Sequence, residues 1–136
     1  MNETLFIEST EFTPEINFNL SQRKLLFKGV SRPEDVIKFY QPAIQWLKDL
    51  EHKIHTQANM RYSIPSFRVE FRMSYFNSAS SKMLLEILQI LRRIREMGVE
   101  ILIDWYYDVN DEAMYEDGMD LSDAVDIPFT YHPIPS

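Results

Sequence analysis

The chain has 136 residues, enough for one domain, and 45% of them are hydrophobic, as in folded globular proteins. The absence of cysteine excludes disulfide bonds, thiolate metal sites and cysteine nucleophiles, and it fits the reducing cytoplasm, where we expect this protein to act. No apolar run reaches the length of a membrane span, and the first residues lack a signal-peptide pattern, so no membrane partner is expected.

The net charge of −7 makes nucleic acid an unexpected partner, because an acidic chain repels polyphosphate. The charge is sorted along the sequence: residues 61–97 are basic, whereas residues 104–126 hold nine acidic residues and no lysine or arginine. We interpret these two segments as solvated faces that partly neutralise each other.

The three glycines are far apart, which excludes the glycine-rich loops of P-loop and dinucleotide-binding enzymes and the nucleophile elbow of serine hydrolases. The histidines have no further ligands at a recognisable metal-binding spacing. We therefore expect no cofactor and no metal, and we do not expect a nucleotide-dependent enzyme of the common kinds.

The first predicted elements are strands over residues 4–8, 15–20 and 24–30, of which the last two form a hairpin. A helix is predicted over residues 33–54, and residues 55–65 are predicted to be a loop.

The predicted first helix carries two local signals. Ser31 and Glu34 have the spacing of a capping box at its start. Pro42 removes a backbone hydrogen bond, so we expect a helix that is kinked or broken there.

Residues 66–76 show the clearest strand alternation in the chain. The side chains predicted to share its buried side are Phe67, Val69, Phe71, Met73 and Tyr75. A helix to about residue 97 and a strand over 99–107 follow, which together predict a right-handed βαβ unit with a parallel strand pair.

A short acidic helix over residues 111–125 and a last strand over 127–132 complete the predicted elements. Pro128 favours an edge position for this strand. The predicted fold class is α/β, with residues 1–136 as a single domain in which helices pack on a mixed sheet.

The segment Asn77-Ser78-Ala79-Ser80-Ser81-Lys82 lies between a buried strand and an amphipathic helix. One interpretation of Ser78 is a helix cap, since serine and asparagine satisfy free backbone amides. The other is a phosphorylation site, because the free amides and the dipole at a helix start favour a phosphate. The residues alone leave both open.

Several motifs in the same order, spread over about residues 5–131, resemble the SiaC family of regulatory phosphoproteins. They are Thr13-Pro14-Glu15-Ile16, Phe39-Tyr40-Gln41-Pro42 with Trp46-Leu47, Tyr75-Phe76-Asn77-Ser78 with Ser80-Ser81-Lys82, Asp104-Trp105-Tyr106-Tyr107, and Ile127-Pro128-Phe129. The family is similar in architecture to STAS-type anti-sigma factor antagonists, whose switch residue lies at the start of a helix after a strand. Ser78 occupies that position in this sequence.

The resemblance implies a non-enzymatic protein of a bacterial partner-switching pathway. It implies a serine/threonine kinase that phosphorylates Ser78, a PP2C-type phosphatase that reverses the reaction, and an effector that the unmodified form activates. In this family the effector is a diguanylate cyclase, which connects the pathway to c-di-GMP signalling. Asn77, Ser80 and Ser81 are expected to cap the helix and to form hydrogen bonds beside the switch residue.

The expected effector surface is the polar side of the helix that follows Ser78. Lys82, Gln89 and Arg93 lie at helical spacing away from the apolar stripe and are the expected contacts. Trp105 and Tyr107 form an aromatic run that is a further partner surface, since Trp and Tyr are favoured contact residues.

Two other functions stay open at this stage. One is a STAS-like interaction module that is not regulated by phosphorylation. The other is a small hydrolase with Asp104, Asp108 and Asp111 around a metal ion.

Overall fold

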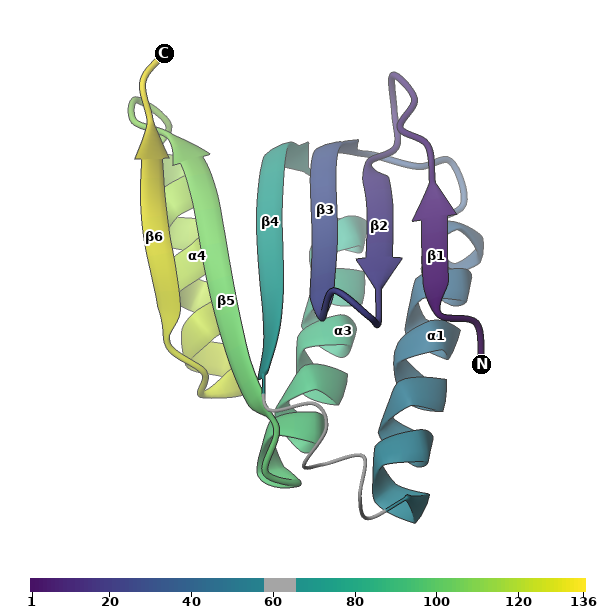
Figure 1. The fold of residues 1–136 in the computed structure, drawn as a ribbon. Helices are drawn as coiled ribbons and strands as arrows, with labels where there is room; N and C mark the ends of the chain where they lie inside the picture. The colour runs from purple at the N-terminus through teal and green to yellow at the C-terminus, as the bar shows by residue number, and fades with distance from the viewer. Residues whose placement is uncertain (58–65) are drawn as a thin grey trace.

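The computed structural model describes residues 1–57 and 66–136, and the expected loop at 58–65 lies outside the described residues. Six strands and three helices follow one another in these ranges (Figure 1). They are β1 (Thr4–Ile7), β2 (Glu15–Asn19), β3 (Lys24–Ser31), α1 (Val36–Thr56), β4 (Ser66–Phe76), α3 (Ser78–Glu96), β5 (Glu100–Asp108), α4 (Glu112–Val125) and β6 (Phe129–Ile134). None of these helices is long and apolar enough to cross a membrane.

The six strands lie in the sheet in the order of the sequence. β1, β2 and β3 pair antiparallel, whereas β3 to β6 are parallel and are joined by α1, α3 and α4. Right-handed crossovers that always step in the same direction put every helix on one side of the sheet. All three helices accordingly cover the same face, and in the described part of the chain the other face carries no helix (Figure 1). The expected mixed α/β sheet is confirmed, with β6 at its edge as predicted.

The hydrophobic core fills the space between the sheet and the helices. Aromatic rings run across its strands: Phe27 stacks on Phe71 at 4.8 Å, and Phe71 packs against Trp105 at 5.4 Å. From the helix side, Leu47 of α1 and Leu88 of α3 are fully buried. This core fixes the strand ends from which the candidate site is built.

The start of α1 differs from the prediction. Asp35 is the N-cap residue, and its carboxylate accepts a hydrogen bond from the backbone N–H of Lys38. Ser31 instead belongs to β3 and is buried, so it is not part of a capping box. Pro42 lies inside one continuous helix that runs to Thr56. Of the two expected alternatives, a kinked or a broken helix, the broken one is therefore wrong.

A β-bulge between β3 and β4 changes which side chains of β4 face the core. The register shifts between Gly29 and Val30, so that Gly29 pairs with Met73 but Val30 pairs with Tyr75. Because an extra residue reverses strand alternation, the predicted buried Tyr75 is 49% exposed. Phe76 packs on the core in its place, against Trp105 at 6.0 Å.

Candidate functional site

Ser78 is the first residue of α3, directly beyond the end of β4. Asn77 caps the helix, and its side-chain oxygen accepts a 2.8 Å hydrogen bond from the backbone N–H of Ser80. The hydroxyl group of Ser78 is exposed and makes no hydrogen bond with the described part of the chain. Capping is therefore done by Asn77, and no residue within 1–57 or 66–136 engages the hydroxyl group of Ser78.

The first turn of α3 offers donors to an anion. The N–H of Ser80 is bound by the Asn77 side chain, and the N–H of Ser81 donates to the Asn77 carbonyl at 2.9 Å. The N–H groups of Ser78 and Ala79 have no hydrogen-bond partner among the described residues. Together with the dipole of a 19-residue helix, these two groups favour a negative charge at the position of the Ser78 hydroxyl.

Ser80 has a different role from the expected cap. It is fully buried, and its hydroxyl donates to the Ser31 carbonyl at 3.1 Å and accepts from the Ser31 hydroxyl at 2.8 Å. Tyr40 of α1 completes this cluster through a hydrogen bond to the Ser31 hydroxyl. Burial raises the pKa of Tyr40 to about 12. The hydrogen bonds of Tyr40 with Ser31 and Ser80 act to lower this pKa, but their effect is smaller than that of burial. Ser31 and Tyr40 carry no signal in the sequence that would assign them to this site.

Exposed apolar side chains lie at the same end of the sheet as Ser78. Phe12 is 48% exposed in the β1–β2 loop, Ile37 is 68% exposed in the first turn of α1, and Tyr75 precedes the helix start. The backbone joins these parts, because the N–H of Arg32 donates to the Phe12 carbonyl and the N–H of Asn77 to the Ser31 carbonyl. The sequence analysis did not single out Phe12 or Ile37, since isolated apolar residues in loops and first turns carry no pattern.

A groove between α1 and α3 contains the predicted polar surface. Lys82, Gln89 and Arg93 are exposed along α3 and, with Lys48 of α1, line a hollow of about 510 Å³. Lys82 is one helical turn from Ser78 and has no ion-pair partner among the described residues. Arg93 is held by Glu51 of α1 through two hydrogen bonds of 2.6 and 3.0 Å, and these bonds raise its pKa further.

The aromatic run at the end of β5 is placed differently from the expectation. Trp105 is only 1% exposed, and its indole N–H donates to the Met114 carbonyl at 3.0 Å. This corrects its assignment to a partner surface, because a core side chain presents no area to a partner. Tyr107 is half-buried and packs against Tyr115 of α4. Tyr106, between them, faces the helix-free side of the sheet.

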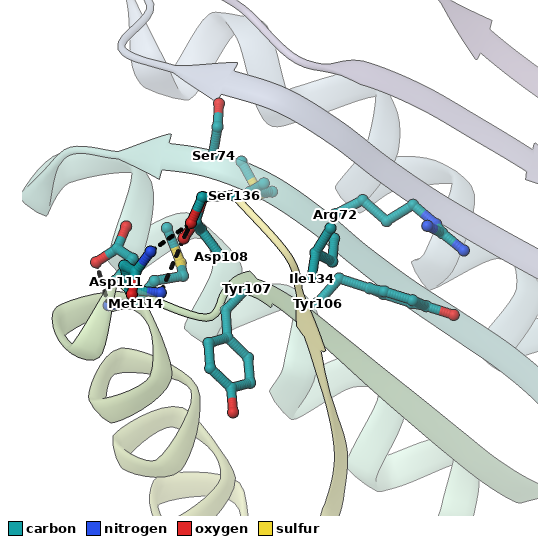
Figure 2. A pocket seen from close by; sticks show the side chains of 11 residues that line it. Arg72, Ser74, Tyr106, Tyr107, Asp108, Asp111, Met114, Ile134 and Ser136 are labelled. Carbon is teal, nitrogen blue, oxygen red and sulfur yellow. Dashed lines mark hydrogen bonds between the residues drawn. The ribbon is translucent and has the colours of Figure 1, made fainter.

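A second hollow of about 610 Å³ lies where β4 and β5 separate, beyond their last pair, Phe71 and Trp105 (Figure 2). Asp108 and Asp111 line it, but each is already engaged. Asp108 accepts from the Asn110 backbone N–H and the Ser136 hydroxyl, which lowers its pKa, and Asp111 caps α4.

The hydrolase hypothesis also required Asp104 to join these two carboxylates. Asp104 instead bonds Arg68 and His132. Within residues 1–57 and 66–136, no three metal-ligating side chains gather. The geometry therefore offers no observation in favour of a metal-dependent hydrolase.

Comparison with known proteins places the chain in a family. The profile of the SiaC family of regulatory phosphoproteins matches residues 7–134. The chain belongs to this family. A functionally uncharacterized protein of Pseudomonas aeruginosa strain UCBPP-PA14 is 23% identical over 125 residues, which cover 92% of each chain.

Solved structures of the family share this fold. The crystal structure of apo-SiaC from Pseudomonas aeruginosa superposes with a TM-score of 0.80 at 23% identity, over 95% of this chain and 98% of that one. The structure of the diguanylate cyclase SiaD in complex with its activator SiaC, from the same organism, matches with a TM-score of 0.82 at 23% identity, over 96% of this chain and 99% of the matched chain. At this identity the likeness establishes the fold.

Proposed function

We propose that this protein is the phosphorylation-controlled switch of a partner-switching pathway and that Ser78 is its phosphoacceptor. In the unmodified state it binds and activates an effector, a diguanylate cyclase. A serine/threonine kinase adds the phosphate and a PP2C-type phosphatase removes it. The protein itself carries out no catalysis. We place the switch in the cytoplasm, because the kinase draws its ATP from there.

The free hydroxyl of Ser78 at the start of α3 is the observation that carries this proposal. Of the three serines in this turn, Ser80 is fully buried with its hydroxyl bound on both sides, so a kinase would have to unfold the turn to reach it. Ser81 is partly buried. Ser78 alone of these three is exposed. The proposed acceptor is therefore the exposed serine of this turn, and a phosphate on it would break no hydrogen bond with the described residues.

A phosphate at Ser78 controls binding if it lies within the effector interface. It adds roughly −1.5 to −2 charges at the end of the sheet that also carries the exposed apolar side chains Phe12, Ile37 and Tyr75. An effector that covers these side chains would have to remove water from the phosphate, and an unpaired buried charge costs several kcal/mol. Lys82, one turn away, is close enough along the helix to pair with the phosphate.

The effector class follows from the family and its solved complex. In that complex the cyclase SiaD is bound to SiaC, which is described as its activator. We extend this role to the present chain because the family profile spans almost all of it. The expected contacts are the apolar residues around Ser78 and the polar groove side chains Lys82, Gln89 and Arg93.

Phosphorylation by the partner kinase with ATP, followed by peptide mapping, tests the acceptor. We expect one phosphate on Ser78 and none on the Ser78→Ala variant, whereas Ser81→Ala, the matched control from the same turn, is modified like the unaltered chain. A phosphate on Ser80 or Ser81 in the unaltered chain would overturn the assignment. Absence of phosphate from every serine would instead favour an interaction module of the same fold that is not regulated in this way.

A further inference from the structure

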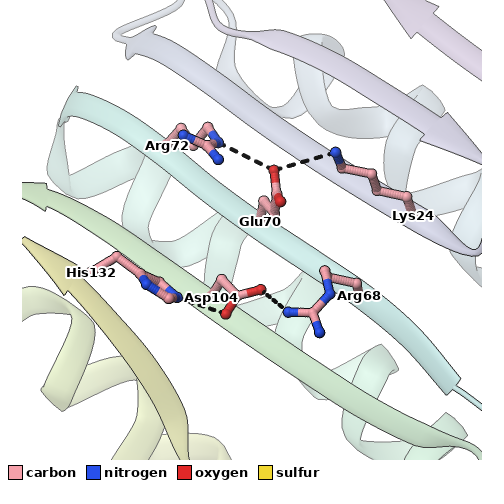
Figure 3. Close-up of polar contacts among 6 residues, drawn as sticks. All are labelled: Lys24, Arg68, Glu70, Arg72, Asp104 and His132. Carbon is pink, nitrogen blue, oxygen red and sulfur yellow. Dashed lines mark hydrogen bonds and ion pairs between the residues drawn. The ribbon is translucent and has the colours of Figure 1, made fainter. Parts of the chain in front are cut away.

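The helix-free face of the sheet carries a connected set of polar and charged side chains across four strands (Figure 3), and the ring of Tyr106 packs against two of them. Its members are Lys24 of β3, Arg68, Glu70 and Arg72 of β4, Asp104 and Tyr106 of β5, and His132 of β6. We call these seven residues the open-face network. None of them lines the groove between α1 and α3 or belongs to the first turn of α3.

Two carboxylates hold the network together. Glu70 lies between Lys24 at 3.6 Å and Arg72 at 3.2 Å. Asp104 lies between Arg68 at 2.6 Å and His132 at 2.8 Å. Burial acts to raise the pKa of Asp104, but the bonds from His132 and Arg68 outweigh it and keep this pKa below its usual value. Each carboxylate therefore fixes the positions of two basic groups.

Tyr106 connects the two halves of the network. The guanidinium of Arg72 lies 3.7 Å from the centre of its ring, and the ring of His132 stacks on it at 4.5 Å. Arg72 contacts both this aromatic ring and the carboxylate of Glu70, and these two contacts hold its guanidinium in a defined orientation.

The charges of the network are sorted by depth. The carboxylate side chains of Glu70 and Asp104 are only 10% and 6% exposed, whereas those of Lys24, Arg72 and Arg68 are 45%, 37% and 52% exposed. The outer surface is therefore basic although the whole chain has a net charge of −7. A partner that approaches this face meets cations and an aromatic ring, with the anions underneath.

We propose that the open-face network is a second docking surface, which binds an acidic, aromatic-containing segment of a partner protein. Charge complementarity selects this occupant, because exposed guanidinium groups bind carboxylates in a bidentate way and Tyr106 adds an aromatic contact. An acidic protein segment is favoured over nucleic acid, since the basic area is small and the remainder of the chain repels polyphosphate.

The network is also pre-organised for binding. Lysine and arginine side chains lose conformational freedom when they are immobilised in an interface. The ion pairs with Glu70 and Asp104 and the stack on Tyr106 already restrict the basic side chains in the free protein. The surface does not depend on Ser78, so the proposal stands independently of the proposed switch.

An NMR titration of the ¹⁵N-labelled full chain with a synthetic peptide of alternating Glu and Tyr residues tests the surface. We expect chemical-shift changes on β3 to β6, weakened by added salt, and none with the peptide in which Lys replaces Glu. The double variant Arg68→Gln/Arg72→Gln should bind at least about tenfold more weakly. Arg92→Gln, an arginine of α3 with 45% side-chain exposure and its own ion pair with Glu96, is the matched control and should bind unchanged.

Three kinds of result would overturn the proposal. One is binding of the Glu–Tyr peptide at another place, seen either as equal affinity of the double variant and the unaltered chain or as shifts confined to the groove between α1 and α3. Another is tighter binding of single-stranded DNA than of the peptide at the same salt concentration. The third is self-association of the unaltered chain in sedimentation experiments that the double variant abolishes, because the occupant would then be a second copy. If the double variant loses its fold, the single variant Lys24→Gln serves in its place, with a smaller expected loss of affinity.

Discussion

The hydroxyl group of Ser31 donates a 2.8 Å hydrogen bond to the hydroxyl group of Ser80, 49 residues further along the chain. This bond joins the end of β3 to the first turn of α3, and Tyr40 extends the connection to α1. The proposed phosphoacceptor Ser78 thus lies on a helical turn that buried hydrogen bonds attach to β3 and α1. A phosphate can act there through its charge in an interface, without a rearrangement of the helix start.

The buried bond predicts a large difference between two serines of the same turn. Ser80→Ala removes two buried hydrogen bonds, so that the Ser31 hydroxyl keeps only Tyr40 and the Ser31 carbonyl keeps only the Asn77 N–H. This loss should lower the free energy of unfolding by about 1–3 kcal/mol. Ser81→Ala removes a hydroxyl that is only partly buried and should stay within about 0.5 kcal/mol. Urea denaturation of both variants measures the difference. Equal stabilities would contradict the role given to the buried cluster.

Because Asn77 caps α3, we predict that its side chain contributes to stability and that the side chain of Ser78 does not. Asn77→Ala removes the acceptor of the Ser80 N–H and should cost about 1 kcal/mol. Ser78→Ala removes a hydroxyl group that makes no hydrogen bond with the described residues, and it should leave the unfolding midpoint nearly unchanged. Thermal denaturation of the two variants gives the comparison, and a larger loss from Ser78→Ala would show that Ser78 itself caps the helix.

The ion pairs of Asp104 predict a pH-dependent contribution to stability. Because the folded-state pKa of Asp104 is lowered, its contribution is fully present above the unfolded-state value of about 3.9 and is lost as the pH falls through the folded-state pKa. Asp104→Asn should therefore be less stable than the unaltered chain near neutral pH. Urea denaturation at a series of pH values should show that the difference in free energy of unfolding between the unaltered chain and Asp104→Asn, the stability gap, narrows below about pH 4. A gap that stays constant down to pH 2 would contradict the lowered pKa.

Gly118 lies inside α4, and its replacement by alanine is predicted to change stability in the opposite direction from most Gly→Ala substitutions in helices. Gly to Ala within a helix ordinarily adds up to about 1 kcal/mol of stability. A Cβ atom at Gly118, however, would come within 2.6 Å of the Trp105 indole. Gly118→Ala should therefore lower the free energy of unfolding by about 1–3 kcal/mol. Calorimetry measures whether Gly118→Ala raises or lowers the stability. Asp120→Ala, at an exposed position of the same helix, is the control. A stabilised Gly118→Ala variant would show that the indole moves aside at little cost.

Much of the fold could be predicted because strong periodic patterns set it. The alternation in residues 66–73 and the apolar stripe of the second long helix both correspond to elements of the structure. The alternation failed at Tyr75, where the bulge opposite Gly29 and Val30 reverses the two sides of β4. Its cause lies in the pairing with another strand, which no periodicity within residues 66–76 can reveal.

The candidate site was predictable only in part. The position of Ser78 at a helix start followed from the sequence, but the choice between cap and free hydroxyl required the contact of Asn77 with Ser80. Ser31 and Tyr40 reach the site through tertiary packing alone. The burial of Trp105 could not be deduced either, because a Trp-Tyr-Tyr run places its members on both faces and gives no sign of which face is the core.

The affinity of the effector cyclase for this protein, with and without phosphate on Ser78, tests the central claim most directly. Protein with phosphoserine incorporated only at position 78 can be compared with the unmodified chain by calorimetric titration into the partner cyclase. Protein with phosphoserine at position 81 serves as the control for charge in the same turn. The proposed switch predicts that phosphate at Ser78 weakens binding at least about tenfold and that phosphate at Ser81 weakens it less. Equal affinity of the Ser78-phosphorylated and unmodified forms would contradict it.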